Sequence, residues 1–455
     1  MLSTNAALLS LGQKHTTHGL GRVIDDAIIE NASGSYMTFD DGRTMLDFTC
    51  GIGVTSLGHC HPQISKAAAD QCMSVIHGQC SIAFHTPYVR LIEELLPMMP
   101  DPSLDSFFFW NSGSEAIEAA LKIARIATGR QNIICMQSGY HGRTFGAMAV
   151  TRSKTIYSAG VHPIMPGVFQ TPYPYFHPLG LPKETSPAEL SEFCLKQLGL
   201  VLTSQTAPSD TAAIIIEPIL GEGGYVSTPV EFLQGLRRIC DTYGIMLIID
   251  EVQSGFSRSG DYFAIEQSGV RPDILVIAKG LANGFPLSGV ISRKELTDKL
   301  PPGSMGGTYA GNAISCAAAV EVAKIMKGGD ILPNVRARSK QAFDALNALA
   351  ADPEVGRYIL DVRGRGLMIG LEFKAPAGPA EIKSGFVSQV YSDLPAGLAA
   401  KVMKRCVKKG LLILTTSAFE VLRLIPPLNI TEEDMKKGID IIAESIREAV
   451  KESAN

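Results

Sequence analysis

The stretch IMLIIDEVQSGFSRSGDYFAIEQSGVRPDILVIAK, residues 245–279, decides the fold. Residues 246–249 and 274–277 are short apolar runs without alternation, which is typical of strands covered on both faces of a parallel sheet. Asp250 follows the first run, and Lys279 lies just beyond the second. Because ligands bind outside the carboxyl ends of strands in open α/β sheets, this acid and this amine are predicted to belong to a site.

A lysine and a carboxylate at one sheet edge are the pair that pyridoxal phosphate (PLP) chemistry requires. We expect Asp250 to keep the pyridine nitrogen protonated, so that the ring accepts the electrons released when a substrate Cα–H bond breaks. We expect Lys279 to hold the cofactor as a Schiff base and then, once displaced by substrate, to move the proton from Cα. On this pair alone, a structural ion pair at a strand end remains the alternative.

Length and composition limit the class of protein. A chain of 455 residues, 45% of them hydrophobic, predicts two lobes. Its 41 basic and 45 acidic residues give a net charge of -4 without a basic stripe, so nucleic acid is not an expected partner. No apolar run reaches the length of a membrane span, and we expect no membrane association. Nine cysteines without a CxxC pair are typical of a reducing, cytoplasmic compartment.

Two features near the N-terminus could indicate a metal site and a targeting segment, and neither interpretation is favoured. His59, Cys60 and His61 would point to opposite faces of an extended segment, so no metal site is predicted. The first two dozen residues carry no acid before Asp25, as in a transit peptide, but they lack an Arg-rich amphipathic segment. We therefore expect a frayed cytoplasmic N-terminus, with a mitochondrial location left open.

The next patterns place a phosphate site. Residues 31–54 predict a meander of short strands, residues 62–98 contain two helical patterns, and residues 106–110 form an aromatic strand. Ser112 and Glu115 have capping-box spacing before a helical pattern that ends at Gly129. Free N–H groups at such a helix start bind phosphate, with Gly113 and Ser114 as candidates. An ordinary capped helix is the alternative.

Two further strands end in polar residues. The strand at 132–136 leads to SGYHGRT, where Tyr140 is placed to stack on a flat ring, with His141 and Arg143 beside it. A solvent-facing tyrosine is the alternative. Residues 151–210 have little periodicity before a helix near 187–200, and we interpret them as a long loop over the site. The strand at 212–216 then ends in EPILGEGG, which brings Glu217 and Glu222 to the same edge.

Five strands thus deliver polar residues to one edge, which predicts one shared active site. They end near Asn111, Gln137, Glu217, Asp250 and Lys279. A loop, another strand and an alanine-rich helix follow. From about Gly328 we expect a smaller α/β lobe, with helices at 336–351, 397–409 and from Glu432, and strands at RGRGLMIGLEF, LLILTT and VLRLIPPLNIT. The expected division is an N-terminal segment of the small lobe at 1–62, a large PLP-binding domain at 63–327 and a C-terminal small domain at 328–455.

From about residue 24 to 448, the chain resembles the class III (ω-amino acid) aminotransferases, and within them the 4-aminobutyrate enzymes. The resemblance lies in GIGVTSLGHCHP, NSGSEAIEAALKIAR, SGYHGRT, IIIEPILGEGGY, IIDEVQSGFSRSG, IAKGLANGFPLSGV, GGTYAGN, VRGRGLMIGLEF and VLRLIPPLNIT, in the family's order. It implies a fold-type I PLP enzyme, α/β in class. The large domain should have a mostly parallel seven-stranded sheet, and a smaller α/β domain should follow.

The resemblance also implies residue roles. The cofactor would be held by Gly113, Ser114, Tyr140, His141, Asp250, Val252, Gln253 and Lys279, with Gln253 at the phenolic oxygen and Val252 under the ring. Thr308 matches a threonine that contacts the phosphate from the neighbouring subunit, which implies a homodimer or a dimer of such dimers.

The family's substrate residues fall on Ile52, Arg143, Glu222 and Arg423. Arg143 would hold a distal carboxylate and Arg423 the α-carboxylate of glutamate, while Glu222 would pair with Arg423 until glutamate arrives. The alternative is that these arginines brace loops. Two departures from the 4-aminobutyrate enzymes, the small Ser81 and a long segment at 170–209, are expected to line or cover the substrate entrance.

The expected reaction is transfer of an amino group from an ω-amino acid such as 4-aminobutyrate to a keto acid such as 2-oxoglutarate, by a ping-pong mechanism. Other class III activities remain open: ornithine, acetylornithine, diamine or amine aminotransferase, and amino-acid racemase or aminomutase. A dinucleotide-dependent dehydrogenase is disfavoured, because no G-x-G-x-x-G motif opens a helix after the first strand.

Overall fold

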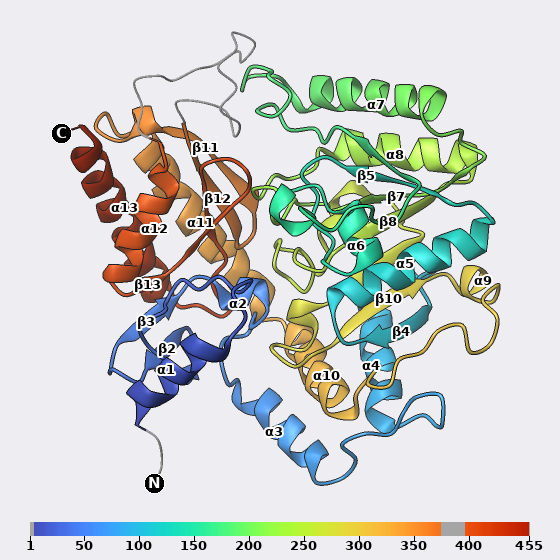
Figure 1. The fold of residues 1–455 in the computed structure, drawn as a ribbon, viewed down its shortest axis with the longest axis horizontal. Coiled ribbons are helices and arrows are strands. Elements are labelled where there is room, and N and C mark those ends of the chain that lie inside the picture. Colours follow the sequence, from blue (N-terminus) through green and yellow to red (C-terminus); the bar gives the residue numbers. More distant parts are fainter. Residues whose placement is uncertain (1–3, 375–395, 455) are drawn as a thin grey trace.

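A seven-stranded sheet forms the centre of the larger part of the molecule (Figure 1). The computed structural model describes residues 4–374 and 396–454. The strand order is β4-β10-β9-β8-β7-β5-β6, and only β10 runs antiparallel to its neighbours. The strands are β4 (Ser106–Trp110), β5 (Asn132–Met136), β6 (Val168–Thr171), β7 (Thr211–Ile216), β8 (Met246–Asp250), β9 (Ile274–Ile277) and β10 (Ser288–Ser292). This is the α/β, fold-type I architecture.

Both faces of this sheet are covered, which is why its strands lack alternation. Ile215 and Ile248 pack with α5 (Gly113–Thr128) and α6 (Phe145–Val150) on one face. Ile214 and Ile249, their neighbours in sequence, pack on the opposite face. Helices that contribute to this second core include α4 (Thr86–Leu95), α7 (Pro187–Ser204), α8 (Val230–Tyr243) and α10 (Ala313–Lys327).

The smaller part joins the two ends of the chain (Figure 1). One sheet contains β1 (Ile29–Ser33), β2 (Tyr36–Phe39), β3 (Thr44–Asp47) and β13 (Leu411–Leu412). The other contains β11 (Ile359–Arg365), β12 (Met368–Phe373), β15 (Val421–Leu424) and β14 (Leu414–Thr416), in that order. The helices of this part are α11 (Ile331–Ala350), α12 (Leu398–Lys408) and α13 (Glu432–Ala454). Because β13 pairs with β3, the N-terminal strands belong to the same sheet as a C-terminal strand. The divisions at residues 62 and 327 stay a prediction.

Three expectations about local structure were wrong. The N-terminus is not frayed from residue 4 onward, because Thr4 caps a helix, α1 (Asn5–His15), by accepting from the N–H of Ala7 at 3.3 Å. Its side chains are not buried, so the pattern gave no signal. The sequence RGRGLMIGLEF forms most of a hairpin of β11 and β12 rather than one strand. Within the unpatterned segment 151–210, β6 was missed because it is a short strand at the sheet edge.

The segment 170–209 does not line the cavity described below. Its first residues belong to β6, and α7 packs against α8 on the second face of the sheet. The part of this segment between β6 and α7 reaches the small-lobe strand β12 instead, through Tyr175 and His177. The apolar helix of this segment extends the core, and the expectation that the segment covers the substrate entrance stays a prediction.

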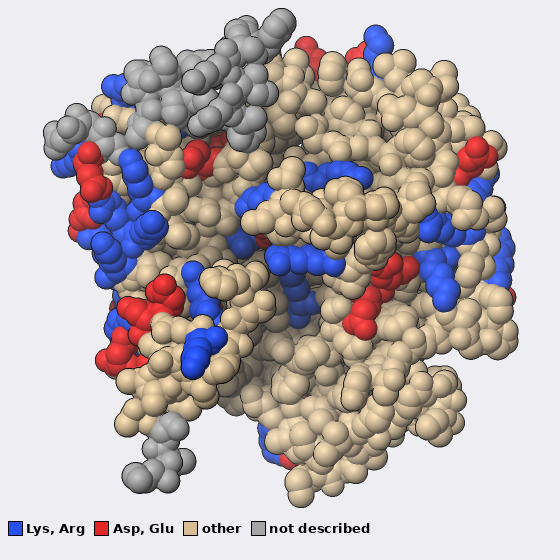
Figure 2. Space-filling model, in the orientation of Figure 1, with Lys and Arg blue, Asp and Glu red and all other residues tan. Residues whose placement is uncertain are grey.

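Other features of the described residues, 4–374 and 396–454, limit what the protein contains. No helix among them is both long enough and apolar enough to cross a membrane. No group of three or more His, Cys, Asp or Glu side chains among them could hold a metal ion. His59 instead pairs with Asp47 at 2.8 Å. All nine cysteines are free thiols. Basic and acidic side chains are interspersed over the face in Figure 2.

Candidate active site

A cavity of about 300 Å3 lies at the carboxyl edge of the seven-stranded sheet. Residues that follow β4, β5, β7, β8 and β9 all line it. They are Asn111, Ser112, Gly113 and Ser114 after β4, Tyr140, His141 and Gly142 after β5, Glu217 after β7, Asp250, Val252 and Gln253 at and after β8, and Ala278 and Lys279 after β9. The structure thus brings together the strand ends that the sequence singled out.

The start of α5 forms one wall of this cavity. Ser112 and Glu115 make a reciprocal capping box, in which Glu115 accepts from the Ser112 N–H at 2.8 Å. Gly113 packs closely on Val252, since an added Cβ would lie 3.1 Å from a methyl group of that valine. The next N–H groups of the helix belong to Gly113 and Ser114, which line the cavity. Unpaired N–H groups and the positive end of the helix dipole suit a phosphate.

Asp250 is held from two sides at the floor of the cavity. One carboxylate oxygen lies 2.7 Å from Nδ1 of His141, and the other accepts from the N–H of Val252 at 2.9 Å. The backbone of His141 is held in turn, because its backbone N–H donates to the Thr151 hydroxyl at 2.9 Å. Within the described chain, Nε2 of His141 is buried and has no partner. The arrangement orients the Asp250 carboxylate as a fixed acceptor.

Lys279 lies across the cavity on a strained backbone. Its φ of +47° is in the left-handed region, where a residue with a side chain costs about 1–3 kcal/mol and persists only if the surroundings enforce it. Burial lowers the pKa of Lys279 to about 8, although Glu222, Asp250 and Glu217 oppose this shift. Within the described residues, no side chain hydrogen-bonds its amine. A lysine with this pKa is still mostly protonated at pH 7, but a much larger fraction of it is neutral than for an exposed lysine.

Glu217 is a buried carboxylate that holds the backbone of two loops. Its oxygens accept from the N–H groups of Tyr140 and Gly221, each at 2.8 Å. Burial raises the pKa of Glu217 to about 7, and the nearby Asp250 adds to this shift, while His141 opposes it. Glu217 therefore positions the aromatic Tyr140 beside the cavity, a role that spacing in the sequence did not suggest.

The residues of this cavity fit PLP. The helix start at Gly113 offers a phosphate cradle, and Asp250 offers a carboxylate for a pyridinium nitrogen. Oε1 of Gln253 is buried without a partner in the described chain, as expected of a group that would meet a polar ring substituent. Lys279 supplies the amine. Tyr140 and Val252 supply a ring and an apolar surface for a flat group.

Glu222 and Arg423 form an ion pair next to Lys279. Their side chains are 13% and 5% exposed, and Nη1 of Arg423 donates to Oε1 of Glu222. Burial by itself raises the pKa of Glu222, but Arg423 lowers it below its ordinary value. Burial likewise disfavours the charge of Arg423, yet Tyr225 and Glu222 raise its pKa. Both groups are thus charged, and the pair is held by their mutual attraction.

Arg143 lies on the other side of the aromatic residue Tyr140. Its side-chain Nε donates to the Tyr140 hydroxyl at 3.1 Å, and its backbone N–H donates to Oγ of Ser114 at 3.2 Å. The guanidinium lies 4.7 Å from the ring centroid of Tyr157. No carboxylate of the described chain forms an ion pair with Arg143, so its charge is available to an acidic ligand.

Arg143, Glu222 and Arg423 lie beside the cavity rather than in its lining, and three other expected residues also lie outside it. Ile52 is exposed, with a left-handed φ of +68°, two residues before Val54, which does line it. Thr308 is exposed in a turn and does not line the cavity. Ser81 is also exposed and donates to Gln79, so in this chain it meets no cavity residue. Their roles stay predictions.

Lys154 and Tyr157 are site residues that the sequence did not reveal. Tyr157 packs edge-on against Tyr140, with ring centroids 5.1 Å apart. Burial lowers the pKa of Lys154, while Glu222 raises it and Arg423 lowers it, so all three groups share one electrostatic environment. Both residues lie in the segment 151–210 that was expected to form a loop over the site, but no local pattern singled out either of them.

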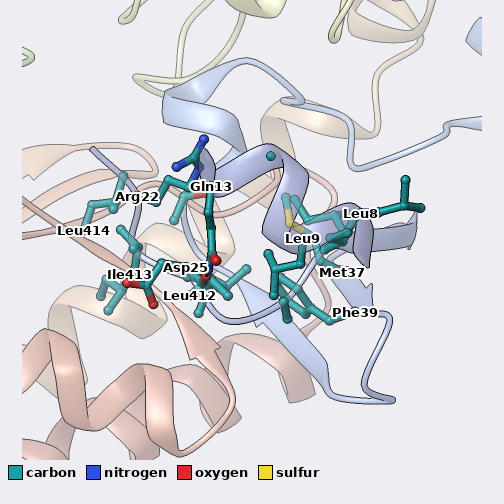
Figure 3. A pocket seen from close by; sticks show the side chains of 17 residues that line it. Leu8, Leu9, Gln13, Arg22, Asp25, Met37, Phe39, Leu412, Ile413 and Leu414 are labelled. Carbon is teal, nitrogen blue, oxygen red and sulfur yellow. The ribbon is translucent and has the colours of Figure 1, made fainter. Parts of the chain in front are cut away.

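A larger cavity, of about 600 Å3, lies elsewhere and contains no comparable chemistry. It is formed between α1 and the β1–β3 sheet, with Leu8, Leu9, Met37 and Phe39 among its lining residues (Figure 3). It shares no residue with the cavity at the sheet edge. Its lining is mainly aliphatic and has no lysine beside a carboxylate, so the smaller cavity is the candidate active site.

Comparison with known proteins agrees with this geometry. Residues 21–446 match the family described as aminotransferase class-III. The chain is 36% identical over 452 residues to the 4-aminobutyrate aminotransferase GabT of Escherichia coli (strain K12), covering 98% of this chain and 100% of that protein. It is 35% identical over 453 residues to the 5-aminovalerate aminotransferase DavT of Pseudomonas aeruginosa, with the same coverage.

A solved structure agrees in fold. The (S)-enantioselective omega-transaminase from Thermomicrobium roseum superposes with a TM-score of 0.87 at 25% identity, over 100% of both chains. The match of the family to most of the chain and the full-length relatives above 30% identity establish the membership. The protein therefore belongs to the class III aminotransferases and is a PLP-dependent aminotransferase of the ω-amino acid type.

Proposed function

We propose that the enzyme transfers the amino group of an ω-amino acid, such as 4-aminobutyrate or 5-aminovalerate, to 2-oxoglutarate in two half-reactions. The observation that carries this proposal is the buried pair of Glu222 and Arg423 on one side of Lys279, with Arg143 beside Tyr140 and in no ion pair with a carboxylate of the described residues. Two arginines can bind two carboxylates, and Arg is the side chain that recognises carboxylates with two hydrogen bonds.

A Glu222 side chain that can leave Arg423 explains how one pocket binds both an ω-amino acid and glutamate. An ω-amino acid has one carboxylate, which Arg143 would bind, and Glu222 then neutralises Arg423. Glutamate and 2-oxoglutarate have a second carboxylate, which would replace Glu222 at Arg423. A buried arginine left without a counter-charge is costly, so a movable carboxylate is favourable in the first case.

The remaining steps use residues at the sheet edge. PLP, when bound, supplies a protonated ring that accepts the electron pair released from the substrate carbon. Asp250, fixed by His141 and Val252, would hold the proton on the ring nitrogen. Lys279 Nζ, with its pKa near 8, would take the proton from the substrate carbon that carries the amine. A base with a pKa near the working pH is efficient in such a transfer.

Single-turnover spectroscopy tests this proposal. The purified enzyme would be mixed with 4-aminobutyrate, 5-aminovalerate, glutamate or a simple amine without a carboxylate, and loss of the cofactor's visible band would be followed. We expect fast reaction with glutamate and with at least one ω-amino acid. A simple amine as the best donor would contradict the use of two carboxylate anchors, and interconversion without keto-acid consumption would indicate racemase or aminomutase activity.

We further propose that the enzyme is a homodimer, or a pair of such dimers, in which Thr308 completes the phosphate site of the partner. Apolar side chains are exposed along residues 73–96, with Met73 at 89%, Ile82 at 84% and Phe84 at 75%. Tyr309, next to Thr308, is 65% exposed. Exposed apolar side chains in such number are typical of an interface. The nine free thiols support a cytoplasmic location.

A further inference from the structure

A buried ion pair outside the cavity holds the turn that carries Glu222. This turn, residues 221–225, follows β7. Arg363 on β11 donates from Nε to the carbonyl oxygen of Gly224 at 2.9 Å. Its Nη1 pairs with the carboxylate of Glu372 on β12. The two side chains are 10% and 0% exposed, so one planar guanidinium links the turn to the small-lobe sheet away from solvent.

Glu372 is fixed by residues from the larger part of the molecule. Its carboxylate accepts from the Tyr175 hydroxyl, and Nδ1 of His177 lies 2.6 Å from it. Burial alone raises the pKa of Glu372, but Arg363 and then His177 lower it, so the carboxylate is charged. The Arg363 guanidinium also lies 4.8 Å from the ring centroid of Tyr175. The position of Arg363 is therefore set by several contacts.

The backbone of the turn is held on its other side as well. The N–H of Ser417 donates to the carbonyl of Glu222 at 2.9 Å, and its hydroxyl donates to the carbonyl of Gly223 at 3.1 Å. Gly224 has a φ of +114°, and an added Cβ would lie 3.0 Å from Nη2 of Arg363. The turn is enclosed between β11 and the residues after β14, while the Glu222 side chain reaches Arg423.

We propose that Arg363 is a positioning residue that sets the Glu222 carboxylate opposite Arg423 and thereby favours donors without an α-carboxylate. The proposal rests on the proposed function. When an ω-amino acid is bound, the substrate has no α-carboxylate, and Glu222 neutralises the charge of Arg423. With glutamate bound, the substrate's own carboxylate takes that place. Accurate placement of Glu222 therefore matters in the first half-reaction and much less in the second.

The variant Arg363→Lys isolates this contact. Lysine keeps a positive charge opposite Glu372, but it lacks the planar fork that bonds a carboxylate and the Gly224 carbonyl together. We expect the half-reaction with the ω-amino acid to slow by about three- to tenfold relative to that with glutamate, the effect of one lost hydrogen bond. Hydrogen–deuterium exchange of the peptide spanning 218–228 should also become faster in cofactor-free protein.

Two further variants make the result decisive. Arg365→Lys is the matched control, because Arg365 lies on the same strand but pairs with Asp261, and it should leave the ratio of half-reactions unchanged. Glu222→Gln should shift that ratio in the same direction as Arg363→Lys. If Arg363→Lys slows both half-reactions equally, or leaves exchange of the turn unchanged, the positioning role is overturned. Failure of the proposed function is seen separately, as wild-type enzyme that reacts with neither ω-amino acid.

Discussion

The Asp250 carboxylate lies 2.7 Å from Nδ1 of His141, and both side chains are buried at the end of the sheet. The second carboxylate oxygen accepts from Val252, so Asp250 cannot rotate away from the cavity without losing two hydrogen bonds. This geometry suits a carboxylate that must hold a proton on a ring nitrogen in one position. It also suggests how to separate cofactor binding from chemistry.

We expect Asp250→Asn to abolish amino transfer while PLP still binds. The amide keeps the shape of the side chain but cannot stabilise a protonated ring, whereas the phosphate contacts at Gly113 and Ser114 remain. We expect half-reaction rates to fall by roughly a hundredfold or more, as when a group that stabilises transition-state charge is lost. The visible spectrum reports binding and single-turnover rates report chemistry. Rates within a few-fold of the wild type would refute this role.

Lys279 is expected to carry the cofactor. Borohydride reduction of the holoenzyme followed by peptide mapping should place the label on Lys279, because its amine is the one that lines the cavity. Lys279→Ala should give no label. A conservative control is Lys154→Arg, which alters the nearby partly buried amine and should leave the label in place. A label on another lysine would rule out the assignment.

The depressed pKa of Lys279 predicts a pH dependence. PLP condenses with the neutral amine, and burial lowers the pKa of Lys279 to about 8. The rate of PLP incorporation into cofactor-free enzyme should thus rise with pH and level off above about 8, rather than rising toward the ordinary lysine value of 10.5. Glu222 raises this pKa, so Glu222→Gln should move the profile to lower pH. An unchanged profile in that variant would contradict the coupling.

The two arginines should differ in their effects on the half-reactions. Arg423→Ala should impair the reaction with 2-oxoglutarate far more than that with 4-aminobutyrate, whereas Arg143→Ala should impair both. Each affected step should lose roughly 2–5 kcal/mol of transition-state stabilisation, as for removal of one member of a buried charge pair. Single-turnover rates with each substrate measure this. Equal behaviour of the two variants would exclude the dual-anchor interpretation.

The exposed apolar residues predict a dimer that charge can disrupt. We expect Phe84→Asp combined with Ile82→Asp to shift the enzyme toward monomer and to weaken PLP binding, because Thr308 would no longer reach the partner's site. Sedimentation velocity and cofactor titration measure the two effects. A matched control, Leu200→Asp, changes another exposed apolar side chain, at 54% exposure, on α7 and away from the cavity. A wild-type enzyme that sediments as a monomer would contradict the proposal.

Much of the cofactor site could be predicted from the sequence because its signals are local. Apolar runs that lack alternation marked β7, β8 and β9, and a polar residue near the end of each run marked the sheet edge. The capping box of Ser112 and Glu115, a motif of four consecutive residues, marked the start of α5. Periodicity and capping depend on neighbours in the chain, so they survive in a sequence read without a structure.

The contacts that adapt this site to substrates were decided by tertiary structure. Glu222 and Arg423 are 201 residues apart, and Arg363 reaches Gly224 across 139 residues. The resemblance suggested the first pair, but nothing in the sequence suggested the second. A loop over the site was expected at 151–210, yet no signal singled out Lys154 or Tyr157 within it. The two long-range pairs form where β15 and β11 of the smaller part meet the turn after β7 of the large sheet. Their geometry depends on how two lobes meet, which no pattern of neighbouring residues encodes.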